Sequence, residues 1–172
     1  MSKNLKIFSL VLSVLIFAIC PQIANAQAGM QTFSENGISF EYPSSCQLSR
    51  SVPPPVFIGV FLPTNDGSNL TFAVENLPYQ LSIQEYTQKA IENLNSVFKC
   101  TIDNQRPMNV AGYPAMSVTV TFNMAGTQIQ QEQIYVVVGM RAYCIGITGT
   151  PNNFMGAKQA AYRIINTIRF QP

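Results

Sequence analysis

The longest regular pattern in this sequence is an alternation of apolar and polar residues in its second half. Apolar side chains occupy every second position of residues 116–122, and Ser or Thr occupies the positions between them. A period of two residues predicts a β-strand with one face in a core. The chain then turns within residues 123–126, returns through 128–138, and turns again at 139–140 into a third apolar segment, 141–148. Strands joined by such short turns are neighbours, so this stretch predicts an antiparallel meander.

Two other segments have the three-to-four spacing of an amphipathic helix. The first begins at a capping box, Ser82 with Glu85, and ends near Lys99. The second follows Thr150, which suits a helix cap, and its apolar face reaches Ile168. Further extended segments are predicted over residues 38–42, 56–62, 70–77 and 101–110. The pattern therefore predicts the α+β class, an α-β-α sandwich with an antiparallel sheet of about six to seven strands flanked by two helices.

Residues 1–26 have the three zones of a cleavable export signal. A basic start is followed by an unbroken apolar run over residues 7–20, and Ala24 and Ala26 match the pattern that signal peptidase accepts. A run of this length is too short for a membrane-spanning helix, which needs about 20 residues. We therefore expect cleavage directly after Ala26 and no permanent membrane anchor.

The remaining residues, 27–172, are expected to form one exported domain, periplasmic or secreted, or lumenal in the thylakoid if the source is an oxygenic phototroph. The alternative, lipidation at Cys20, fits less well because Ile19 stands where lipoprotein signals have a small residue. The leader carries two of the ten basic residues and none of the eight acidic ones, so the mature chain is formally neutral. A neutral surface gives no electrostatic reason to bind nucleic acid or an anionic membrane.

Three cysteines remain after cleavage: Cys46, Cys100 and Cys144. An oxidising compartment allows two of them to pair. Cys46 and Cys100 lie at the ends of predicted elements, so we expect a disulfide between them, whereas Cys144 lies within a predicted strand and is expected to be a buried thiol. The other pairings and three isolated thiols remain open, and a free thiol would allow a redox role.

The chain contains no histidine, which excludes Ser-His-Asp and Cys-His catalysis and ordinary zinc or copper sites. The acidic residues are interpreted as surface charges, with Glu85 as a helix cap; the others considered are Glu41, Glu75, Glu92, Glu132, Asp66 and Asp103. The loop over residues 65–69 resembles a calcium-binding turn but lacks the ligand series, so we interpret it as a turn. We therefore expect no catalytic, cofactor-binding or metal-binding residues and no cofactor.

Four short motifs carry a resemblance to a known family: residues 33–43 (FSENGISFEYP), 112–115 (GYPA), 141–143 (RAY) and 164–170 (IINTIRF). Their order around two helices resembles the PsbP/DcrB-like family. The resemblance implies an α-β-α sandwich and an accessory role without catalysis. Members of that family include lumenal extrinsic subunits of photosystem II and exported bacterial proteins of unknown role.

The leading hypothesis is a non-catalytic exported binding protein that docks on a membrane-associated protein complex through a weakly charged sheet edge or loops. One alternative is a small-ligand carrier, or an enzyme that relies on carboxylates or tyrosine. Another is a subunit similar to the photosystem II extrinsic proteins, if the source is photosynthetic.

Overall fold

A computed structural model describes residues 29–64 and 66–171. The predicted signal peptide, with Ala24 and Ala26 at its cleavage site, lies outside the described residues. In chain order the elements are β1 Met30–Glu35, β2 Ile38–Pro43, β3 Gln47–Ser49, β4 Val56–Phe61, β5 Asn69–Asn76, α1 Ile83–Phe98, β6 Thr101–Val110, β7 Tyr113–Met124, β8 Thr127–Val138, β9 Arg141–Gly149, α2 Phe154–Ile165 and β10 Arg169–Phe170.

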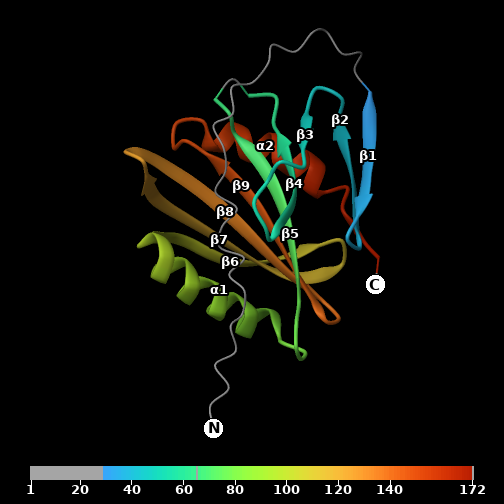
Figure 1. The fold of residues 1–172 in the computed structure, drawn as a ribbon, viewed down its shortest axis with the longest axis vertical. Helices are drawn as coiled ribbons and strands as arrows, with labels where there is room; N and C mark the ends of the chain where they lie inside the picture. Colours follow the sequence, from blue (N-terminus) through green and yellow to red (C-terminus); the bar gives the residue numbers. More distant parts are fainter. Residues whose placement is uncertain (1–28, 65, 172) are drawn as a thin grey trace.

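A seven-stranded antiparallel sheet forms the centre of the molecule, in the order β3-β4-β5-β9-β8-β7-β6 (Figure 1). Strands β7, β8 and β9 are the predicted meander, in which Thr119 pairs with Glu132 and Glu132 pairs with Ile147. Gly139 begins the turn between β8 and β9 with a φ of 59°, a conformation that glycine adopts without steric cost. The predicted α+β class and the antiparallel sheet between two helices are confirmed.

Helix α1 covers one face of this sheet at β7 and β8. It begins at the predicted capping box, where the Ser82 hydroxyl accepts from the Glu85 N–H and the Glu85 carboxylate accepts from the Ser82 N–H. Tyr86 and Leu94 are buried on the inner side of the helix, in a hydrophobic cluster with β7. The helix ends at Lys99, whose left-handed backbone stops the helical path.

Helix α2 covers the opposite face of the sheet at β5 and β9. The predicted start at Thr150 is wrong, because the Thr150 carbonyl accepts the Asn153 N–H in a turn and the helix begins only at Phe154. The predicted apolar face also extends too far, since Ile168 is buried beyond the end of the helix. Neither described helix is long and apolar enough to span a membrane.

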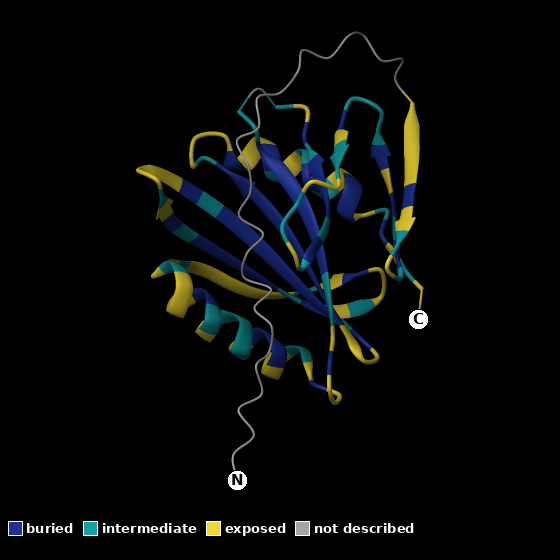
Figure 2. Cartoon of the chain, in the orientation of Figure 1, coloured by how far each residue is buried: buried dark blue, intermediate teal, exposed yellow. Residues whose placement is uncertain are grey.

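A second sheet, β1-β2-β10, has no counterpart in the sequence prediction. It lies against α2 and β5: Phe40 of β2 stacks on Phe72 of β5 with the ring centroids 4.4 Å apart. The Thr167 hydroxyl, just after α2, accepts the Glu41 N–H of β2 at 2.8 Å. The small sheet thus extends the core beneath α2, while α1 has a separate core on the other face. Figure 2 shows both cores as buried sheet strands and buried inner helix faces.

The predicted disulfide between Cys46 and Cys100 is not formed, and both residues are free thiols. Cys46 precedes β3 and Cys100 precedes β6, and these two strands are the opposite edges of the seven-stranded sheet. The two thiols also contact different cores, Cys46 on the α2 side and Cys100 on the α1 side. Cys144 is a free thiol buried within β9, only 1% exposed.

Candidate functional site

A fully buried carboxylate, Glu132, lies in β8 on the face that α2 covers. Its exposed fraction is 0%. The two-residue period of a strand places it on the same face as Ile134, a member of the core beneath α2. Strand register brings Arg106 of β6 opposite Ser117 of β7, one diagonal step from Glu132. Three neighbouring strands therefore supply polar side chains to one point of this face.

The charged cluster, as we call Arg106, Ser117, Glu132, Lys158 and Tyr162, brings hydrogen-bond donors to one oxygen of this carboxylate and a cation to the other. Lys158 of α2 places its Nζ 3.0 Å from Glu132 Oε2. The other oxygen, Oε1, accepts from Ser117 at 2.5 Å, from Tyr162 at 3.1 Å and from Arg106 at 3.3 Å. Arg106 also donates to the Tyr162 hydroxyl at 3.1 Å. The charged cluster therefore joins α2 to β6, β7 and β8.

The charged cluster fixes the protonation state of the buried Glu132 and of the partly buried Tyr162. Burial opposes ionisation of Glu132, but hydrogen bonds from Ser117 and Lys158 outweigh it, so the pKa of Glu132 lies below its ordinary value. Burial, together with the Glu132 charge, raises the pKa of Tyr162 to about 12. At neutral pH the carboxylate is ionised and the phenol is protonated. Because general acid–base catalysts need a pKa near the working pH, this arrangement is suited to anchoring a helix, not to proton transfer.

The interpretation of Glu132 as a surface charge is wrong. The sequence does contain a local signal for its burial. Glu132 occupies every-second-residue spacing with Ile134 and Val136 in β8, so it lies on the same face as these two core residues. Its partners give no such signal: Lys158 and Tyr162 follow Glu132 in the sequence by a whole strand and a turn. Only the folded chain brings them to the carboxylate.

The opposite face of β8 carries a neutral polar row beneath α1, formed by Gln131, Gln133 and Tyr135, all 0% exposed. The Tyr135 hydroxyl donates to the Gln133 carboxamide oxygen. Gln133 in turn donates to Gln131 at 2.6 Å, and Gln131 donates to Thr148 of β9 at 2.9 Å. The neutral polar row is thus a continuous chain of hydrogen bonds in a core, which satisfies groups that would be costly to bury alone.

Cys144 and Glu75 lie beside the neutral polar row, on the same face. The Cys144 Sγ is 3.9 Å from the Gln133 side-chain oxygen. Burial and the nearby Glu75 charge raise the pKa of the Cys144 thiol. A buried thiol with a raised pKa forms little thiolate, the reactive species, so this cysteine does not favour the redox hypothesis.

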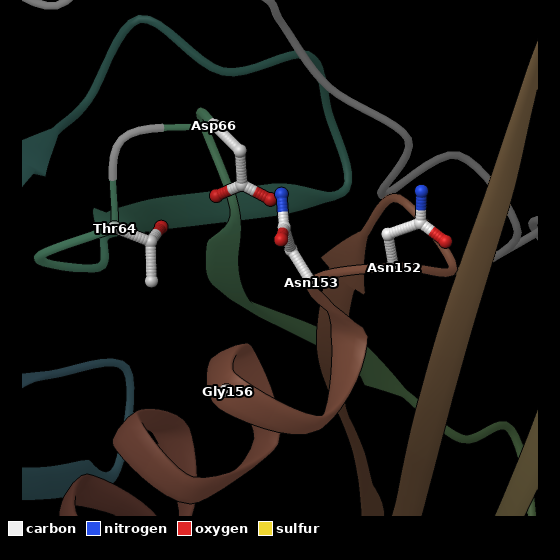
Figure 3. Close-up of a pocket in the computed structure, with 5 residues that line it drawn as sticks. All are labelled: Thr64, Asp66, Asn152, Asn153 and Gly156. Atoms are coloured by element: carbon white, nitrogen blue, oxygen red, sulfur yellow. The ribbon is translucent and has the colours of Figure 1, made fainter.

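An open cavity of about 440 Å³ lies where the loop after β4 meets the start of α2 (Figure 3). Its lining residues are polar or lack a side chain: Thr64, Asp66, Asn152, Asn153 and Gly156. The two contributing segments are distant in sequence but adjacent in space, because β5 and β9 pair along their length and each has one end at this cavity. The described residues contain no group of three or more His, Cys, Asp and Glu side chains able to hold a metal ion.

Asp66 is the one acidic side chain of the cavity lining. Ser68 holds it in place: the Ser68 N–H and hydroxyl donate to Oδ1 at 3.2 and 2.8 Å, and the hydroxyl lies 2.7 Å from Oδ2. Burial opposes its ionisation, but the bonds from Ser68 prevail, and the pKa of Asp66 lies below its ordinary value. Figure 3 shows the Asn153 carboxamide directed toward this carboxylate. The cavity therefore presents a fixed negative acceptor beside carboxamide groups.

The fold and these sites define a class, an α+β protein whose antiparallel sheet lies between two helices. The sequence profile of the PsbP-like protein family matches residues 20–170. The chain therefore belongs to the PsbP-like family, as the resemblance predicted. A comparison with curated protein sequences finds no significant match.

Several solved structures have this fold at low sequence identity. CyanoP, the PsbP of the cyanobacterium Synechocystis sp. PCC 6803, has a TM-score of 0.64 at 11% identity and covers 88% of this chain and 98% of its own. LpqN of Mycobacterium tuberculosis, described as involved in cell envelope biogenesis, has a TM-score of 0.65 at 15% identity, with coverages of 86% and 93%. PA94 of Pseudomonas aeruginosa, described as a protein of unknown function and putative regulator, has a TM-score of 0.58 at 13% identity, with coverages of 83% and 98%. Identities this low show a common fold alone.

Proposed function

We propose that this chain is a non-catalytic exported protein that docks on a protein partner in a membrane-associated complex. The observation that carries the proposal is a pair of large apolar side chains exposed on neighbouring loops. Tyr79, in the loop after β5, is 47% exposed, and Met140, in the turn between β8 and β9, is 48% exposed. We call these two residues the loop-tip patch.

The two loops of the loop-tip patch are joined through the backbone. The Leu77 N–H donates to the Met140 carbonyl at 2.7 Å, so the loop that carries Tyr79 is fixed to the turn that carries Met140. Both loops extend from paired strands of the central sheet, β5 and β9. This bond restrains the two loops relative to each other, which lowers the conformational entropy that a partner's binding would cost.

The composition of the loop-tip patch suits a protein partner. Tyrosine and methionine are enriched at the centres of protein interfaces, and tyrosine is frequent among the residues that contribute most to affinity. The formally neutral mature chain provides no field to attract a nucleic acid or an anionic lipid surface. An accessory role agrees with membership in the PsbP-like family and with the envelope context given for LpqN. Export through the predicted leader would bring the chain to that setting.

The test compares two double variants of the full-length, tagged chain expressed in its own host. Tyr79→Ser with Met140→Ser changes the loop-tip patch, and Val97→Ser with Met155→Ser is the matched control. Val97 and Met155, located on α1 and α2, are apolar residues that are more exposed than the loop-tip patch, at 52% and 66%. After mild crosslinking of the envelope, we expect the loop-tip variant to recover the partner about tenfold less than the unmodified chain does. Equal recovery by both double variants would refute the docking surface.

A further inference from the structure

The cavity at the start of α2 lies at the other end of the molecule from the loop-tip patch. Strand β5 begins beside the cavity at Asn69 and ends beside Leu77, and β9 runs from Met140 back to the cavity at Gly149. The length of two paired strands therefore separates the cavity from the proposed docking surface. Any activity of the cavity goes beyond docking and is testable without a partner protein.

Gly156 is the feature of the cavity that folding does not explain. It occupies the first turn of α2, where glycine is among the poorest helix formers. Its backbone does not need a positive φ, and a Cβ added there would meet no atom within 4 Å. Alanine would therefore fit and strengthen the helix. Gly156 is exposed, and its missing side chain leaves the helix backbone accessible at the open side of a polar cavity, as close approach of a ligand requires.

The polar groups of the cavity are both acceptors and donors. The Asp66 carboxylate accepts only, whereas the carboxamides of Asn152 and Asn153 both donate and accept. Asn153 makes no side-chain bond to the first turn of α2, so that turn also presents backbone N–H groups without a side-chain cap. An anion would match the N–H groups but meet the charge of Asp66, and an apolar ligand would cover the Asn152 carboxamide and the backbone N–H groups without pairing them. Hydroxyl groups, which donate and accept, match both kinds of group.

We propose that this cavity is a binding site for a neutral polyhydroxylated ligand, a sugar unit. Its volume of about 440 Å³ falls within the range of small-molecule sites, about 300–1,000 Å³. Asp66, positioned by Ser68, accepts from ligand hydroxyls, Asn152 supplies a carboxamide, and Gly156 admits the ring against the helix. The site is distinct from the charged cluster, whose carboxylate, Glu132, is 0% exposed beneath α2.

The experiment is a titration of the isotope-labelled mature chain, followed by amide and carboxamide NMR signals. The probes are glucose and N-acetylglucosamine, with inorganic phosphate and calcium chloride as comparison arms. We expect one of the sugars to cause saturable shifts confined to residues 64–68 and 152–156. The Gly156→Met variant, which fills the open space with a good helix former, should weaken that binding about tenfold or more. The matched control Met155→Ala changes the exposed neighbour in the same turn and should bind as the unmodified chain does.

The outcomes separate binding from folding. Gly156→Ala serves as a second variant, because it should raise the melting temperature while it narrows the cavity, so a loss of binding in it does not reflect unfolding. Localised sugar shifts that Gly156→Met abolishes support the site. Absence of shifts with both sugars, equal shifts in Gly156→Met, or shifts with phosphate or calcium alone would overturn it. None of these results depends on whether the loop-tip patch binds a partner.

Discussion

Each face of the central sheet carries an acidic residue, the fully buried Glu132 and the partly buried Glu75, and the two faces shift the pKa of this residue in opposite directions. On the α2 face, Glu132 lies between Lys158 and Arg106, and its pKa is lowered. On the α1 face, burial raises the pKa of Glu75, whose hydrogen-bond partner is the neutral phenol of Tyr86. Burial opposes ionisation in both places. The difference shows that the partners, and not burial alone, decide whether a carboxyl group keeps its charge in this protein.

The same contrast extends to the side chains around each carboxyl group. The α2 face connects helix to sheet through charges, whereas the α1 face uses the neutral polar row of Gln131, Gln133 and Tyr135. Hydrogen bonds between amides and phenols do not depend on pH near neutrality, but ion pairs depend on the titration of their acid. The attachment of α2 through Glu132 should therefore be pH-sensitive, whereas the neutral polar row on the α1 face should not be.

Loss of a cation from the α2 face should have the largest effect. In Lys158→Met the buried Glu132 loses the partner of its Oε2 and keeps Arg106, which is 45% exposed, on the other oxygen. An uncompensated buried charge is costly, and we expect the free energy of unfolding at pH 7 to fall by about 3 kcal/mol. Urea denaturation measures this change. Lys158→Arg should retain most of the stability, and Lys89→Met, on α1, should change it by less than about 0.5 kcal/mol. A similar loss in both methionine variants would contradict the role of the ion pair.

On the α1 face, Tyr135→Phe should have a smaller effect that does not vary with pH. The change removes the hydroxyl that donates to Gln133, which leaves a buried carboxamide oxygen with only the weak donor Cys144 at 3.9 Å. An unsatisfied buried acceptor costs about 2 kcal/mol. The same urea measurement at pH 5 and pH 8 should give equal losses. Tyr79→Phe, which removes an exposed hydroxyl, is the control, and a loss in Tyr135→Phe that changes with pH would contradict a neutral network.

The strands and helices that could be predicted from the sequence are those encoded by residues close together in the chain. The strands of the meander and helix α1 are encoded by periods of two and of three to four residues and by a capping box, so they were predictable. Strands β3 and β10 were missed because they have only three and two residues, and β10 pairs with the distant β2. Strand β1 was missed because Phe33 is the one buried residue among its six, which gives no two-residue alternation. The start of α2 was placed too early because the Thr150 carbonyl joins a turn.

The candidate sites were harder to predict than the fold. Glu132 had a local signal in the alternation of β8, but Lys158 and Arg106 reach it only through tertiary packing. The cavity likewise joins Thr64 and Asp66 to the start of α2. The start of α2 resembles no binding motif, and the loop that carries Asp66 resembles only a calcium-binding turn without its ligand series. The disulfide prediction failed for the same reason, because sequence positions at element ends do not reveal that Cys46 and Cys100 lie at opposite sheet edges.

The smallest expected effect distinguishes the two faces best, because a rise in pH changes the stability contributed by Glu75 and by Glu132 in opposite directions. A raised folded-state pKa, as for Glu75, stabilises the protein below the unfolded value near 4.5 and loses that contribution as the pH rises through the folded pKa. Glu75→Gln should therefore increase stability at pH 7 by about 0.5 kcal/mol, a small value because the group is only partly buried, and change it little at pH 4. Glu132 has the opposite sign: its contribution is present above about pH 4.5 and is lost as the pH falls through its lowered pKa. Glu132→Gln should thus be less stable than the unmodified chain at pH 7 and lose less stability on acidification.

Urea denaturation of both variants and of the unmodified chain from pH 3 to pH 8 measures how the free energy of unfolding changes with pH. If the two substitutions changed this pH dependence with the same sign, the two faces would not differ as their partners indicate.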